Sequence, residues 1–351
     1  MKQPQPRGPV SALLLDILTG PEQDDTGQGS SAGPTSAALA GAVRDALAAT
    51  KDFAFDEDLQ LALFCLFELH YSGIDGTSGD WEWDPDLIAA RRLLEHAYEA
   101  QLHSAVTLPD LPHPTSADVA AGLFDFTGAD GGPSMSKYVA KQATEDQIRE
   151  FLIQKSIYTL KEADPHTWAI PRLTGRAKAA LVEIQADEYG GGAPERMHST
   201  LFAQSMRGVG LEDSYGHYID YVPAITLASS NLMSLFGLNR RLRGAIVGHL
   251  ASYEMTSSLA NRMYARGFRR LGYNDAVAAY FDEHVEADAV HEQIAGRDLA
   301  GGLVEAEPEL LADVFFGAAA AAVVDTWMTS HILDAWSADA TSLYSAAGVS
   351  A

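Results

Sequence analysis

The segment 281–291 contains two histidines and one aspartate at a spacing that places all three on one face of an α-helix. Successive residues of an α-helix are about 100° apart, so Asp288 lies at about +40° and His291 at about −20° from His284. The neighbouring positions on that face are mostly apolar, and we therefore expect it to be buried. A buried imidazole or carboxylate without a partner costs several kcal/mol, so this face requires hydrogen-bond partners or a metal ion. The segment alone is compatible with a metal site and with hydrogen-bonded core histidines.

Two further predicted helices bring acids to inward-facing positions. Along the first, Ile148, Phe151 and Tyr158 form one stripe. Glu162 continues that stripe at the same helical phase. Along the second, an apolar stripe leads in the same way to Glu188. Both acids are therefore expected to point into the interior of a helical bundle, where a carboxylate needs a compensating partner.

The second helix carries two more groups that could bind a metal. If it continues beyond Glu188, Glu195 lies at about −20° and His198 at about −80° from that residue, so the three form one fan. The run Gly190–Pro194 can loosen or break the helix before Glu195. The pair Glu195-x-x-His198 supplies once the Glu-x-x-His motif that ferritin-type sites repeat on two helices.

Together these helices offer four carboxylates and three histidines to one bundle interior. Sites rich in oxygen and nitrogen ligands suit iron or manganese, and helical bundles rich in carboxylates hold two metals in this way. Two bridged Fe(II) ions can reduce O2 and generate an oxidant that attacks C–H or N–H bonds. The alternative is that Glu162, Glu188 and Glu195 are ordinary acids on the solvated faces of amphipathic helices.

The complete pattern is Glu162 … Glu188 … Glu195-x2-His198 … His284-x3-Asp288-x2-His291. It resembles that of the haem-oxygenase-like di-iron oxidases, also called iron-containing redox enzymes, over about residues 145–340. The resemblance implies an all-α, haem-oxygenase-like helical bundle with two Fe(II) ions and O2 as co-substrate. It also implies a division of the ligands: one iron takes Glu162, His198 and His291, the other takes Glu195, His284 and Asp288, and Glu188 bridges them. In this family the metals are often labile, and the third core helix can be partly unwound when metal is absent.

Charge and cysteine content exclude several classes of protein. The 351 residues carry a formal net charge of −24, which argues against nucleic acid or an anionic membrane as a partner. The single cysteine, Cys65, lies between apolar residues and is predicted to be buried, which excludes intrachain disulfides and thiolate metal sites. We find neither a signal peptide nor an 18-residue apolar segment, and therefore expect a cytoplasmic protein.

Helical periodicity without strand-like alternation predicts an all-α protein with three parts. Residues 1–34 contain a stretch rich in Gly, Ser and Asp and are expected to be a flexible lead-in. Residues 35–140 are expected to form an N-terminal helical extension that ends in a connector rich in Pro and Gly. Residues 141–351 are expected to form the di-iron bundle, which opens at a capping box over Thr144–Gln147.

Glu254 is a further candidate outside the ligand pattern. It lies in the middle of a predicted helix over residues 239–268, where it could orient a ligating histidine from behind. The alternative, which we favour, is an ion pair with Arg262 or Arg266.

We expect an enzyme of specialised metabolism that oxidises a small molecule with O2. The preferred substrate is a free aliphatic amino acid, with C–H cleavage leading to desaturation, cyclisation or fragmentation. Polar residues on the helices that face the expected cavity favour this substrate: Ser229, Ser230, Asn231, Thr256 and Ser257. Amino-acid N-oxygenation, oxidative decarboxylation of a fatty acid and a non-catalytic metal-binding bundle are the alternatives. An external electron donor and a homodimer both stay open.

Overall fold

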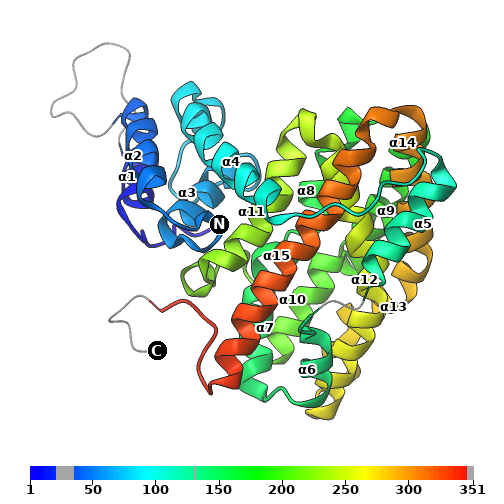
Figure 1. The fold of residues 1–351 in the computed structure, drawn as a ribbon. Coiled ribbons are helices and arrows are strands. Elements are labelled where there is room, and N and C mark those ends of the chain that lie inside the picture. The colour runs from blue at the N-terminus through cyan, green and yellow to red at the C-terminus, as the bar shows by residue number, and fades with distance from the viewer. Residues whose placement is uncertain (21–34, 130–131, 346–351) are drawn as a thin grey trace. The chain divides into compact units, whose positions relative to one another are not determined.

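The computed structural model of the protein describes residues 1–20, 35–129 and 132–345, apart from the side chains of residues 286–289. All regular structure within these ranges is helical, and no strand occurs in them (Figure 1). The predicted all-α fold class is therefore confirmed. The chain divides into two compact units, one made of residues 1–104, 216–231 and 343–351 and the other of residues 105–215 and 232–342.

The first unit is a small helical assembly. Its helices are α1 (Pro9–Thr19), α2 (Ser36–Ala49), α3 (Glu57–Glu68), α4 (Pro85–Ala105) and the beginning of α11 (Ala224–Leu238). Asp56 caps α3 by accepting a hydrogen bond from the Leu59 amide, and every residue from Leu59 to Glu68 is buried. Cys65 lies in this helix and is buried, as predicted, and burial raises the pKa of its thiol.

The structure differs from the expected flexible lead-in over residues 1–34, because residues 9–19 form α1. Asp16 interrupts the apolar run in the sequence, but on the helix it is exposed while Leu14 and Leu18 are buried. The Asp58 carboxylate accepts hydrogen bonds from the Val10 and Ser11 amides, which satisfies donors that the first helical turn leaves free. Residues 21–34 lie outside the described residues.

The second unit is a bundle of long helices that contains the candidate site. Its helices are α5 (Ser116–Thr127), α6 (Met135–Lys141), α7 (Glu145–Thr159), α8 (Asp164–Thr167), α9 (Gly175–Glu188), α10 (His198–Gly208), the end of α11, α12 (Arg243–Arg270), α13 (Asp275–Gln293), α14 (Gly301–Ala306) and α15 (Leu311–Ser337). The predicted capping box opens α7, because Thr144 and Gln147 each bond the other's backbone amide through a side-chain oxygen. The long helix α12 packs against both α13 and α15 (Figure 1).

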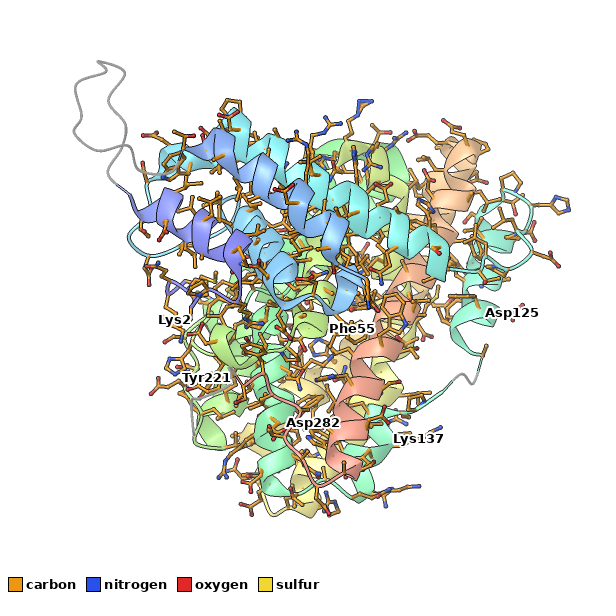
Figure 2. All side chains as sticks on the ribbon, turned by 60° about the vertical axis from the view of Figure 1, so that its left-hand side comes forward. Lys2, Phe55, Asp125, Lys137, Tyr221 and Asp282 are labelled. Carbon is orange, nitrogen blue, oxygen red and sulfur yellow. The ribbon has the colours of Figure 1, made fainter. Side chains whose placement is uncertain are left out.

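The boundary between the units at residue 104 differs from the expected boundary at residue 140. The helices α5 and α6 follow residue 104 in the chain, and both pack against α12 of the bundle. Val119, Ala120 and Leu123 of α5 are buried, whereas Asp125 points outward to solvent (Figure 2). An amphipathic helix of this kind joins the core that covers its apolar face, and here that core is the bundle.

Glycines let α12 and α15 approach each other closely. A Cβ atom at Gly248 would lie 1.8 Å from the carbonyl oxygen of Val314, and one at Gly317 would lie 1.9 Å from that of Ala245. Real Cβ atoms do not come this close, so both positions require glycine as long as the two helix backbones keep this separation.

The segment Pro308–Ser337, which contains α15, is long and apolar enough to cross a membrane by length and composition, because its most apolar 18-residue window has a mean hydropathy of 1.5. The expectation that no such segment exists is therefore wrong. Within the fold, 56% of its most apolar window is buried against other parts of the protein, and the core helix of a soluble protein passes the same test. The cytoplasmic location stays a prediction.

The helix α13 continues directly into a π-helix, Ile294–Ala300, before α14 begins. A π-helix pairs residues i and i+5, and short π segments occur frequently at functional sites. The helix α5 packs across this segment, and the Ser116 hydroxyl donates a hydrogen bond of 2.7 Å to the Arg297 carbonyl oxygen. Gly301 permits this contact, because a Cβ atom there would lie 2.6 Å from the Ser116 carbonyl oxygen.

Candidate metal centre

Carboxylates and histidines from five segments of the second unit meet in two clusters inside the bundle. The first cluster is Glu162, Glu188, His198 and His284, and the second cluster is Glu188, Glu254 and His291. In each cluster, one potential ligand atom from every member lies within 4.8 Å of those of the others. Glu188 belongs to both clusters, so the arrangement offers two adjacent positions for a metal with one shared carboxylate.

Glu162 reaches the first cluster from a turn and not from a helix. The helix α7 ends at Thr159, and Ala163 adopts a left-handed conformation with φ of 76°. The Ala163 carbonyl oxygen accepts a hydrogen bond of 2.9 Å from the Gln185 side chain on α9, three residues before Glu188. This bond ties the turn that carries Glu162 to the helix that carries Glu188.

In the first cluster His198 and His284 lie close together with their rings 4.3 Å apart. His198 Nδ1 is 2.9 Å from Glu188 Oε2, and His284 Nε2 is 3.8 Å from Glu162 Oε1. His284 Nδ1 lies 2.8 Å from the carbonyl oxygen of Tyr280, which can only accept a hydrogen bond. The Nδ1 atom therefore carries the proton, and the lone pair on Nε2 faces the cluster.

Burial and crowded charge shift the pKa values of the first cluster. Burial, reinforced by the negative charge of Glu188, raises the pKa of Glu162 to about 8. Burial, reinforced by the positive charge of His198, lowers the pKa of His284 to about 4. Burial alone would raise the pKa of Glu188, but the hydrogen bond from His198 and the nearby histidine charges bring it below its usual value. A cation among these groups would favour the ionised carboxylates and the neutral imidazoles.

In the second cluster His291 is held between two acids. Its Nε2 atom is 2.9 Å from Asp187 Oδ2, and its Nδ1 atom is 3.4 Å from Glu254 Oε2. Burial alone would lower the pKa of His291, but its bonds to Glu254 and Asp187 raise it to about 9. Asp187 is 61% exposed at the edge of the site, whereas His291 and Glu254 are buried.

The residues present fit a pair of divalent metal ions. The donors are carboxylate oxygens and imidazole nitrogens, which suit iron or manganese. The Oε2 atom of Glu162 is buried and has no hydrogen-bond partner among the described residues. Its Oε1 atom accepts a hydrogen bond of 2.8 Å from the Tyr280 hydroxyl. A buried carboxylate oxygen without a partner is costly in the absence of a cation.

The structure does not bring Glu195 to either cluster. The helix α9 ends at Glu188, and a 3-10 turn over Pro194–Arg196 carries the Glu195 side chain into solvent. Three glycines with left-handed backbone, Gly190, Gly191 and Gly192, produce this break. Glu188, Glu195 and His198 therefore do not lie on one continuous helix, and the helix breaks before Glu195 as the glycine run indicated. His198 still reaches the first cluster, because it begins the next helix, α10. The ligand role of Glu195 stays a prediction without support from this geometry.

Asp288 lies in α13, but its side chain is outside the described residues. Its role as a ligand therefore stays a prediction. Its backbone belongs to the same helix as His284 and His291, as the sequence pattern requires.

Three residues contribute more than the sequence reasoning assigned to them. Glu254, expected either behind a ligand or paired with an arginine, is a member of the second cluster. Tyr280 lies one helical turn before His284, and this spacing could have identified it. Asp187 carries no sequence signal that separates it from an ordinary surface acid.

A pair of buried histidines lies outside both clusters. His166 Nε2 is 3.2 Å from His249 Nδ1. Burial lowers the pKa of His166 to about 4. Burial and the neighbouring His166 also lower the pKa of His249. The two imidazoles are therefore neutral at pH 7 and share one N–H···N hydrogen bond.

Comparison with known proteins places the chain within a described family. Residues 149–326, about half of the chain, match the family described as "Iron-containing redox enzyme". Nitrosourea synthase from Streptomyces achromogenes subsp. streptozoticus is 31% identical over 181 residues. That match covers 51% of this chain and 38% of the relative, so the chain corresponds to well under two thirds of that protein.

Proposed function

Because the chain belongs to the iron-containing redox enzyme family, we propose that it is a non-haem di-iron oxidase that uses O2 to oxidise a small molecule. The observation that carries this proposal is the pair of clusters that share Glu188. The predicted haem-oxygenase-like fold and the predicted family are confirmed by the family match and by the helical bundle. The number of metals, their identity as Fe(II) and the use of O2 belong to the proposal.

The chain's own residues have separate tasks at this centre. Glu162, His198 and His284 would hold one ion, Glu254 and His291 would hold the other, and Glu188 would lie between them. The grouping of the clusters thus exchanges His284 and His291 relative to the division that the sequence resemblance implied. Two Fe(II) ions bound there would supply electrons to reduce O2 and the oxidising power to attack an N–H or C–H bond. Tyr280 orients His284 through its carbonyl oxygen, and its hydroxyl oxygen, 2.8 Å from Glu162 Oε1, donates a hydrogen bond to that atom. Aromatic rings of Phe202 and Phe281, both buried, exclude water from this side of the site.

We propose an amino-acid nitrogen as the atom that is oxidised. The relative is named nitrosourea synthase, and a nitrosourea contains a nitroso nitrogen that is more oxidised than an amine nitrogen. This favours the N-oxygenation alternative over C–H cleavage. Three of the polar residues that favoured C–H cleavage are otherwise engaged: Asn231 bonds Gln60, and the Thr256 and Ser257 hydroxyls bond the backbone of their own helix.

An anaerobic titration with Fe(II), followed by a pulse of O2, tests the metal centre. We expect uptake of about two irons per chain and a transient visible absorbance after O2 is added. The variant His284→Ala should take up about one iron less, whereas His113→Ala, at an exposed histidine, should behave as the unmodified protein. Absence of iron binding, or of any reaction with O2, would contradict the proposal.

The site of oxidation is tested by turnover with free amino acids, including the pair L-lysine and L-norleucine. The two share one carbon skeleton, and L-lysine adds a nitrogen at its end. Mass spectrometry should show products that gain oxygen on nitrogen, and nitrogen-15 labelling should locate it. Loss of two hydrogen atoms from L-norleucine and no reaction at nitrogen in any substrate would favour C–H cleavage instead.

A further inference from the structure

A groove on the second unit lies against the π-helix that follows the metal-binding helix α13. Its volume is about 650 Å³, and its walls come from α5, the beginning of α9, the π-helix and α14. Ala120 and Phe124 of α5 give the groove an apolar surface. A groove of this size with few polar groups has the character of a site for a small molecule.

The groove carries one positive charge that the described residues do not neutralise. Arg176 is already engaged, because its guanidinium contacts Asp298 at 2.5 Å and Glu305 at 3.6 Å. The Arg297 side chain is exposed in the groove and has no ion-pair partner among the described residues. In a chain with a formal net charge of −24, such a position is suited to a carboxylate brought by a ligand.

A methionine of α12 lies beside the apolar wall of this groove. Gly296 of the π-helix faces this methionine, because a Cβ atom there would lie 2.5 Å from Met255 Cε and 3.6 Å from Ala120 and Phe124. Met255 directly follows Glu254 on α12. Its unbranched side chain can change rotamer at little cost, and Gly296 leaves it the space to lie there.

We propose that this groove is the entrance for the substrate, with Arg297 binding its carboxylate and Met255 as a movable gate toward Glu254 and His291. The ligand is a small molecule with a carboxylate at one end and an unbranched aliphatic chain that ends in nitrogen, such as L-lysine, and L-norleucine is its analogue without that nitrogen. This inference rests on the proposed function, because a gate needs a reactive centre behind it. The end remote from the carboxylate is then the end that approaches the metal centre and is oxidised.

Binding of L-norleucine to the metal-free protein, measured by equilibrium dialysis, tests the carboxylate site. We expect Arg297→Gln to weaken binding at least fivefold. The control Arg262→Gln removes the same charge from an exposed position on α12 and should leave binding unchanged. Hexylamine, which has the aliphatic chain without the carboxylate, should not bind. Absence of L-norleucine binding, or equal binding by Arg297→Gln, would overturn the assignment of the groove.

Near-infrared circular dichroism of the Fe(II)-loaded protein under nitrogen tests the gate. L-Norleucine should change the iron bands of the unmodified protein. We expect Met255→Phe to abolish this change while iron uptake is retained, and Gly296→Ala, which presses on Met255 from the other side, to reduce it. The control Met263→Phe on the same helix should respond as the unmodified protein.

The outcomes of the two measurements separate this inference from the proposed function. A spectral change that persists in Met255→Phe would show that the ligand arrives by another route. Binding of L-norleucine at Arg297 without any change in the iron bands of the unmodified protein would also overturn the entrance, and would identify the groove as an effector site. Failure of the unmodified protein to take up iron would instead contradict the proposed function.

Discussion

In the first cluster His284 is neutral and is oriented by a backbone carbonyl, whereas in the second cluster His291 is positively charged and lies between Glu254 and Asp187. The first arrangement already presents a lone pair to a metal. The His291 imidazole must lose a proton before it can do so, and its pKa of about 9 is higher than the pKa of about 8 of Glu162, the protonated carboxyl of the first cluster. The two positions are therefore expected to differ in metal affinity, with the first filling before the second.

The largest effect is expected from removing the preorganised histidine. His284→Ala should abolish metal binding at the first cluster and leave the second, so that Mn(II) titration gives about one ion in place of about two. Exposed His113 provides the matched control. If His284→Ala removes both metals together, the clusters act as one unit and the comparison between them fails.

The buried pair His166 and His249 sharpens the comparison, because both imidazoles are neutral although neither belongs to a cluster. The pKa of His166 is about 4 in the folded protein and about 6.5 when unfolded, so its contribution to stability is complete above pH 6.5. That contribution is lost as pH falls from 6.5 through about 4, and it amounts to about 2 kcal/mol between pH 7 and pH 5. Urea denaturation of the metal-free protein at these two pH values measures it. His166→Gln should show a smaller loss, and an equal loss would argue against this pair as the cause.

Asp187→Asn tests the charged half of the centre. A carboxylate bonded to the distal nitrogen of a ligating histidine typically contributes 10–100-fold to metal affinity, so we expect a loss of about that size at the second cluster alone. Glu183→Gln, on the exposed side of the same helix, makes the same change of charge and should have no effect. Asp187→Glu should restore part of the affinity. Equal affinities in Asp187→Asn and the unmodified protein would remove Asp187 from the centre.

The smallest effect is expected from Tyr280→Phe. The change removes one hydrogen bond to Glu162, which contributes about 1 kcal/mol, and leaves the backbone carbonyl that orients His284. Because Glu162 then holds its proton more firmly, the first metal should bind about fivefold more weakly at neutral pH. A competition titration with a coloured chelator would detect this difference. A loss as large as that of His284→Ala would mean that Tyr280 itself binds the metal.

Helical periodicity was sufficient to predict most of the centre. Spacing within one continuous helix, as for His284 and His291, transfers directly to three dimensions because the helix fixes the angle between residues. Glu188 and His198 also meet as expected, although a break separates them. The match to the family confirms the predicted fold, whose helices can be inferred from apolar stripes and capping residues.

The remaining features depend on geometry that periodicity does not contain. The direction of Glu195 is set by three left-handed glycines, and a helical projection cannot follow the chain through such a turn. Glu254 and Asp187 gain their roles by meeting His291 across helices, and the spacing of residues along one helix does not predict which helices touch. The sequence therefore left two interpretations open for the carboxylate at residue 254, until α12 was placed beside α13.

The π-helix after α13 has a further consequence for how this protein can change during evolution. Each hydrogen-bonded turn of a π-helix contains one residue more than a turn of an α-helix. The π-helix therefore changes the direction around the helix axis in which the residues after it point. Insertion or deletion of a single residue there would rotate Arg297 and its neighbours around the helix axis while His284 and His291 kept their places. Selection could thus alter which molecules are admitted without disturbing the chemistry that acts on them.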